Sequence, residues 1–98
     1  MGVLAASAQK SQLIAYKNDI EYKQLMVQQA KIALLNAEND LVNAGTDLDP
    51  DSPMSKQIEQ RKQRLNALEK KLDMQLDDYD TRLKLIDESI QACDKQGA

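Results

Sequence analysis

The chain of 98 residues has no histidine, no phenylalanine and no tryptophan, and it has a single cysteine. Without histidine, neither a Ser–His nor a Cys–His catalytic pair can form, and imidazole metal sites are excluded. One cysteine, Cys93, cannot form an intramolecular disulfide. Its favoured interpretation is a small apolar helix residue, with an intermolecular disulfide as the alternative. We therefore expect no enzyme activity, no metal and no cofactor.

Long apolar runs are also missing, and no stretch approaches the roughly 18 apolar residues that a membrane-spanning helix needs. Charged residues make up 30% of the chain and its net charge is −3, which argues against nucleic acid as the main partner. The basic residues between Lys56 and Lys71 are interleaved with acidic ones, which favours a solvated helix face over an RNA contact. We expect no membrane span and no nucleic-acid partner.

Helix-breaking residues are scarce, because the two prolines stand at 50 and 53 and the three glycines at 2, 45 and 97. The chain is rich in Ala, Leu, Gln, Lys, Asp and Glu, a composition typical of long helices and coiled coils. Two long helices with a short connection lie antiparallel. The sequence predicts an all-α, coiled-coil-like helical hairpin with no sheet. It forms one domain over 1–98, with a helix over about 3–44, a turn over 45–52 and a helix over about 53–95.

Apolar residues recur in both halves at steps of mostly three and four, the pattern of helices that pack as a coiled coil. In the first helix Lys23 is the only polar residue of this row, and small residues such as Ala30 and Ala37 would let a partner helix approach closely. We predict that the two rows form the intramolecular seam between the helices. The seam comprises Leu13, Ile20, Val27, Leu34, Leu41, Leu65, Leu68, Leu72, Leu76, Tyr79, Leu83, Ile86 and Ile90.

Further apolar residues flank the seam, so each helix is apolar over more of its circumference than one partner helix covers. A two-helix hairpin alone buries little surface and is marginally stable. We therefore predict an assembly face that contacts other copies of the chain. It comprises Leu4, Leu25, Met26, Ile32, Leu35, Met54, Met74 and Leu85.

The stretch between the two helices contains residues that end and begin helices. Gly45 is expected to adopt a left-handed conformation that ends the first helix. Ser52 is a suitable N-cap for the second helix, with Pro53 at its first position, where the missing N–H costs nothing. Pro50 stiffens the connection between them. We predict a rigid corner at this point of the chain.

Three acidic residues in the same stretch, Asp47, Asp49 and Asp51, alternate as the first ligands of an EF-hand calcium loop do. The rest of that pattern fails, because Ser52 stands where glycine is needed and Ile58 where a bidentate glutamate is needed. Acidic groups just ahead of a helix also interact favourably with its dipole. We interpret these residues as part of the corner, with no metal bound.

The corner Pro50-Asp51-Ser52-Pro53, placed near mid-chain between two long helices, resembles the P-x-x-P corner of type III secretion needle subunits. This resemblance implies a small helical hairpin that polymerises with copies of itself into a helical filament or hollow needle. It also implies secretion-apparatus proteins as partners. No cleaved signal peptide is recognised at MGVLAASAQK. The resemblance thus implies an extracellular or cell-surface protein exported without one; the alternative is a cytoplasmic protein.

A different class of function accounts for the heptads equally well. A soluble coiled-coil adaptor or chaperone would form a discrete dimer or four-helix bundle with a protein partner. Heptads indicate that helices meet, and they do not indicate how many. A self-assembling filament subunit is the favoured hypothesis, because the apolar surface exceeds what one partner helix can cover.

Overall fold

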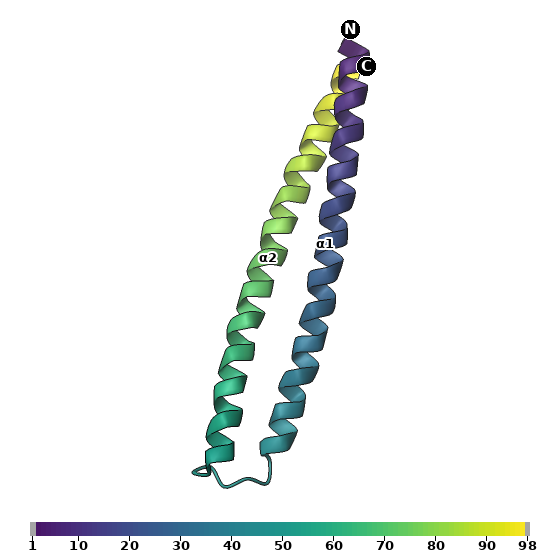
Figure 1. The fold of residues 1–98 in the computed structure, drawn as a ribbon. Helices are drawn as coiled ribbons and strands as arrows, with labels where there is room; N and C mark the ends of the chain where they lie inside the picture. Colours follow the sequence, from purple (N-terminus) through teal and green to yellow (C-terminus); the bar gives the residue numbers. More distant parts are fainter. Residues whose placement is uncertain (1, 98) are drawn as a thin grey trace. The chain divides into compact units, whose positions relative to one another are not determined.

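The computed structural model describes residues 2–97 and consists of two long helices, α1 (Gly2–Gly45) and α2 (Pro53–Gly97), joined by a turn (Figure 1). Met1 and Ala98, the ends of the predicted domain, lie outside this range. Residues 2–97 contain no strand. The prediction of an all-α helical hairpin is confirmed. No helix within these residues has an apolar stretch long enough to span a membrane.

The chain divides into two compact units, each containing a segment of both helices. Unit 1 comprises Met1–Met26 and Leu76–Ala98, and unit 2 comprises Val27–Gln75. In unit 1 the beginning of α1 lies beside the end of α2, and in unit 2 the two helices run antiparallel from the turn (Figure 1). Both helices pass through both units, so each unit is held together by its own helix–helix contact.

The beginning of α2 is fixed by a side-chain cap. The amide of Ser55 donates a hydrogen bond of 3.1 Å to Oγ of Ser52, and the amide of Lys56 donates to the Ser52 carbonyl oxygen at 3.2 Å. Ser52 therefore satisfies one of the amides that a helix start leaves without an intrahelical partner. Pro53 follows as the first helical residue, where its lack of an N–H costs no hydrogen bond.

Asp49 organises the turn just before this cap. Its Oδ1 accepts a hydrogen bond of 3.1 Å from the amide of Asp51, and its carbonyl oxygen accepts one of 3.0 Å from the amide of Ser52. The hydroxyl of Ser55 donates to the same carbonyl at 2.7 Å. A short acidic side chain that bonds to the backbone two residues ahead is a common way to build a turn. The carboxylate of Asp49 thus has a structural partner within the corner.

Gly45 differs from the expectation. The glycines of the described residues have no positive φ, so Gly45 ends α1 as an ordinary right-handed helical residue. It lies against α2 instead, since a Cβ atom built on it would be 3.7 Å from Cγ2 of Ile58. The chain leaves α1 through hydrogen bonds from Thr46 to Asn43 and from Leu48 to Gly45, which tighten the last turn. The left-handed cap was therefore a wrong prediction.

Few side chains are fully buried. Unit 1 buries Ala6, Ile20, Ile86 and Cys93, and unit 2 buries Leu34 and Ile58. Among the described residues no polar or charged residue is fully buried. Most of the other predicted seam residues are half-buried: Leu13, Val27, Leu41, Leu65, Leu72, Leu76, Tyr79, Leu83 and Ile90.

Leu68 lies outside this stripe and is 44% exposed. Apart from Asp73 and Asp87, the buried and half-buried positions of α2 follow two rows with a seven-residue step, one through Ile58, Leu65 and Leu72 and one through Lys62, Glu69 and Leu76. Residue 68 falls one position before the second row, and one residue turns a helix by about 100°. Glu69 therefore takes the half-buried position that the spacing had given to Leu68.

We predict that Gly45→Ala raises the free energy of unfolding by about 0.4–1 kcal/mol, because alanine favours the right-handed helix and its methyl group fits beside Ile58. Urea unfolding followed by circular dichroism measures this change. Gly2→Ala, which adds a methyl group in open space, is the matched control with little effect. Destabilisation by Gly45→Ala would contradict the right-handed conformation.

Candidate functional site

The face of α1 that contacts α2 consists of one apolar and one polar row. The apolar row contains Leu13, Ile20, Val27, Leu34 and Leu41. The polar row contains Lys10, Lys17, Gln24, Lys31 and Glu38, all half-buried and spaced by seven residues. A row with this spacing stays on one face of a helix that packs as a coiled coil. Half of the α1 contact stripe is therefore polar.

In unit 1 the polar row pairs with aspartates of α2. The ammonium of Lys10 lies 2.5 Å from Oδ1 of Asp94, and that of Lys17 lies 2.9 Å from Oδ1 of Asp87. The side-chain amide of Gln24 donates a hydrogen bond of 2.7 Å to Asp80. The hydrogen bond to Asp87 raises the pKa of Lys17.

In unit 2 the same pattern holds for Lys31, whose ammonium lies 2.5 Å from Oδ1 of Asp73. The hydrogen bond to Asp73 raises the pKa of Lys31. In all four pairs, the residue numbers of the α1 and α2 partners add up to 104. We call this set the polar ladder. It defines a single register for the two helices in each unit.

The lysines of the polar ladder retain only a third to two-fifths of their side-chain exposure: 40% for Lys10, 34% for Lys17 and 33% for Lys31. Long basic side chains cover apolar surface with their methylene stems while the charged end reaches a partner near solvent. The ladder therefore contributes apolar contact as well as charge pairing, which is why a stripe that is half polar can hold two helices together.

Sequence reasoning missed this ladder because it looked for apolar residues only. The steps of three and four placed Lys23, Ala30 and Ala37 in the contact row of the first helix; Lys23 and Ala30 are exposed and only Ala37 is half-buried. The available signal was polar: aspartates recur every seven residues from Asp73 to Asp94, and lysine or glutamine every seven from Lys10 to Lys31. Two such complementary rows indicate which face of each helix meets the other.

The polar row of α1 ends in an acid, Glu38, where the other members are hydrogen-bond donors. Oε1 of Glu38 is buried and makes no hydrogen bond. Burial raises the pKa of Glu38, and the nearby carboxylate of Glu69 raises it further. Position 66, which the ladder register places opposite Glu38, is an asparagine with no positive charge to offer. Glu38 and Glu69 of unit 2 therefore repel each other when both carboxylates are ionised.

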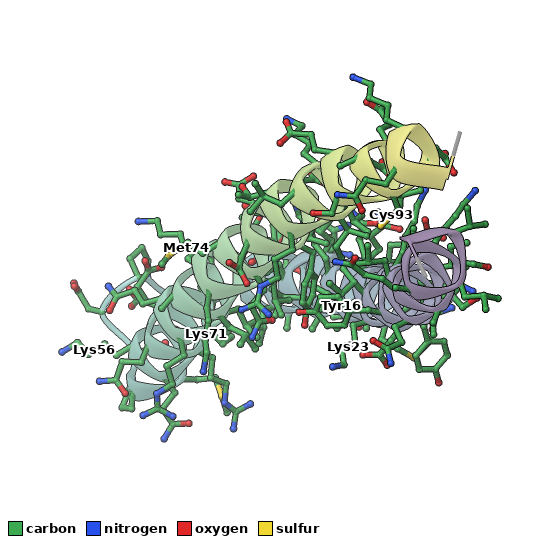
Figure 2. The ribbon with its side chains drawn as sticks, turned by 90° about the horizontal axis from the view of Figure 1, so that it is seen from above. Tyr16, Lys23, Lys56, Lys71, Met74 and Cys93 are labelled. Atoms are coloured by element: carbon green, nitrogen blue, oxygen red, sulfur yellow. The ribbon has the colours of Figure 1, made fainter. Side chains whose placement is uncertain are left out.

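Large apolar side chains remain exposed, and ten of the fourteen in the described residues belong to α1. All eight residues of the predicted assembly face are among them: Leu4, Leu25, Met26, Ile32, Leu35, Met54, Met74 and Leu85. Met74 is 70% exposed and projects into solvent, whereas Cys93 is buried in the helix contact of unit 1 (Figure 2). Burial of the thiol agrees with its interpretation as a small apolar residue.

Unit 2 has an exposed apolar patch on one flank of α1, which we call the outer patch. It consists of Ile32, Leu35 and Val42. At 100° per residue, Leu35 points about 160° away from residue 37, and Val42 about 160° away from residue 44. The outer patch therefore faces away from the side of α1 on which Ala37 and Ala44 lie.

On that other side lies a shallow groove of about 500 Å³, which we call the alanine groove. Its apolar surface comes from Ala37, Leu41 and Ala44 of α1 and Leu65 of α2. Asp40 borders it on α1, and Arg61 and Arg64 border it on α2. Ala37 and Ala44 contribute only methyl groups to this edge of α1, which leaves room for the groove.

We predict that Lys17→Glu lowers the melting temperature, because it places a carboxylate against Asp87. The double variant Lys17→Glu/Asp87→Lys recovers most of the loss, because it restores opposite charges in the same register. Thermal unfolding by circular dichroism at low and high salt measures both effects, and salt weakens them because the pair is partly exposed. Equal melting temperatures for the single and double variants would contradict the ladder.

We predict that Glu38→Gln raises the melting temperature at pH 7. An acid whose pKa is raised on folding destabilises the folded state above that pKa, and the penalty disappears as the pH falls through it. The gain therefore shrinks as the pH is lowered from 7 toward the ordinary glutamate value of 4.5. Glu88→Gln, at an exposed position of α2, is the control. A gain that does not depend on pH would contradict this origin.

Comparison with known proteins found no match to this chain among family models, curated proteins or solved structures. The resemblance of Pro50-Asp51-Ser52-Pro53 to the corner of needle subunits therefore stays a prediction. The features available for a functional proposal are the polar ladder, the outer patch and the alanine groove. Each of them concerns how helices contact helices.

Proposed function

We propose that this chain is a structural subunit that polymerises with copies of itself into a helical filament, needle or tube. The observation that carries this proposal is the presence of two apolar surfaces on opposite sides of α1 in unit 2, the outer patch and the alanine groove. A protein with one self-complementary surface forms closed dimers. A protein with two separate contact surfaces can add subunits without limit.

The uneven division of side chains between the helices supports the same proposal. The exposed surface of α1 is rich in large apolar residues, whereas α2 carries four of the fourteen exposed ones and most of the charged residues of the chain. Water covers a charged helix face at little cost, and an exposed apolar face is stabilised by contact with another protein surface. In the proposed polymer, α1 supplies most of the apolar contact surface, and the charged part of α2 away from the alanine groove faces solvent.

The resemblance at the Pro50–Pro53 corner extends the proposal to an exported, extracellular needle of the type III or flagellar class, with secretion-apparatus proteins as further partners. The alternative is an adaptor or chaperone that forms a discrete four-helix bundle. The two differ in the number of contact surfaces used, because a bundle needs only one of the two apolar surfaces. Particle size as a function of protein concentration separates them.

We predict that the purified protein forms fibres visible by negative-stain electron microscopy and sediments as large particles at tens of micromolar. Ile32→Asp/Leu35→Asp keeps the helical circular dichroism and abolishes the fibres, because it places two charges in the outer patch. Gln60→Asp, at an exposed polar position of α2, is the matched control that still forms fibres. Leu34→Asp, at a buried position of α1, loses helical structure instead.

A discrete dimer or tetramer that stays constant from micromolar to millimolar concentration would favour the adaptor and would contradict the polymer. A stable monomer with no fibres in any solution condition would contradict both. Loss of fibres in Gln60→Asp as well as in Ile32→Asp/Leu35→Asp would show that added charge, and not the outer patch, is responsible.

A further inference from the structure

The borders of the alanine groove carry opposite charges on its two sides. Asp40 stands on the α1 border, and Arg61 and Arg64 stand on the α2 border. All three are exposed, and none takes part in the ion pairs found within residues 2–97, although other lysines and arginines of the chain do. The groove is therefore an apolar surface between an acidic edge and a basic edge whose charges are available to a partner.

We propose that the alanine groove binds the alanine groove of a second copy of the chain, related by a two-fold axis that runs parallel to the helices of unit 2. This inference rests on the proposed self-association and specifies one of its contacts. In this arrangement α1 of one copy lies against α2 of the other. The occupant of the groove is thus the same region of a second molecule.

The charges select this orientation. A two-fold rotation about an axis along the helices exchanges the acidic and basic edges, so Asp40 of each copy meets Arg61 and Arg64 of the other at the same level. The contact is therefore made twice, as an isologous interface requires. The other face-to-face arrangement, α1 against α1, would bring Asp40 near Asp40 and the arginines near arginines. Like charges juxtaposed in an interface repel each other, which disfavours it.

The apolar part of the groove fits a helix–helix contact of this kind. Ala37 and Ala44 present only methyl groups, which allows the partner helix to approach closely. Met54 and Leu68 are exposed on α2 in the same seven-residue row as Arg61, so they lie along the same edge. Pairing two copies would cover these side chains and give each helix antiparallel neighbours, the arrangement of an up-and-down four-helix bundle.

A strongly acidic partner fits the groove less well than a second copy does. Such a partner would pair with Arg61 and Arg64 and would be repelled by Asp40 across the groove. A basic partner would meet the opposite difficulty. The groove of a second copy, after a two-fold rotation, offers a base opposite Asp40 and an acid opposite the arginines with the same spacing.

The test uses the full chain carrying Ile32→Asp/Leu35→Asp, which blocks polymerisation through the outer patch and leaves the alanine groove intact. Sedimentation equilibrium is expected to show a monomer–dimer equilibrium. In this background Asp40→Lys raises the dissociation constant of the dimer at least about tenfold, and so does Arg61→Glu/Arg64→Glu. Each change places like charges in both copies of the contact between position 40 and positions 61 and 64. Circular dichroism is expected to show unchanged helicity, since all three residues are exposed.

The decisive step is to mix the two charge-reversal variants in equal amounts. In the mixed dimer, Lys at position 40 of one chain meets Glu at positions 61 and 64 of the other, while the wild-type Asp40 and arginines pair at the second contact. The dissociation constant is expected to return to within about threefold of that of the unreversed background, because both contacts again pair opposite charges. Reversal that leaves the dimer intact, or a mixture that remains monomeric, would overturn the proposal.

This experiment also separates the groove contact from polymerisation. Fibres of the unmodified chain together with a purely monomeric Ile32→Asp/Leu35→Asp variant would keep the filament and reject the groove contact. Dimers of that variant together with an absence of fibres from the unmodified chain would keep the groove contact and reject the filament. The two proposals therefore fail independently.

Discussion

The polar ladder is the interaction on which the rest of the structure depends, because it determines which face of α1 meets α2. The apolar row through Ile20 and Leu34 could pack against α2 together with either of its flanking rows. Pairing with aspartates draws the lysine row into the contact and leaves Lys23 and Ala30 of the other flanking row exposed. The outer patch and the alanine groove are both consequences of this pairing.

The ladder also shows why one unfavourable residue has a role. If the helices slipped by one heptad, three of the four lysine and glutamine positions in one direction, and all four in the other, would still meet an aspartate or asparagine, so these pairs alone would tolerate the error. Glu38 opposes the slip, because its carboxylate would then meet Asp73 in one direction or Glu59 in the other. We infer that this acid, although unfavourable in the correct register, is more unfavourable in the displaced ones. Polar residues in helix contacts commonly specify register at a cost in stability.

The fold was predictable from the sequence, and the contact between the helices was predictable only in part. Two prolines three residues apart, between two stretches free of internal glycine, determine the helix bounds within a few residues, and the cap at Ser52 follows from ordinary helix chemistry. The apolar rows through Ile20 and Ile86 were also clear. Gly45 was misjudged because glycine at a helix end is usually left-handed, and here the close approach of Ile58 gives it another role. Which face of α1 contacts α2 depends on complementarity between residues far apart in the chain. The spacing of residues within one helix does not reveal this complementarity.

The burial of Cys93 has a kinetic consequence. Its thiol is the only one in the chain, it is 4% exposed, and it lies in unit 1. A reagent or a second thiol can reach it only when the end of α2 separates from the beginning of α1. The rate at which Cys93 reacts with a thiol reagent therefore reports the opening of unit 1. Any disulfide between copies would have to form from that open state, so oxidation would trap molecules whose termini have come apart.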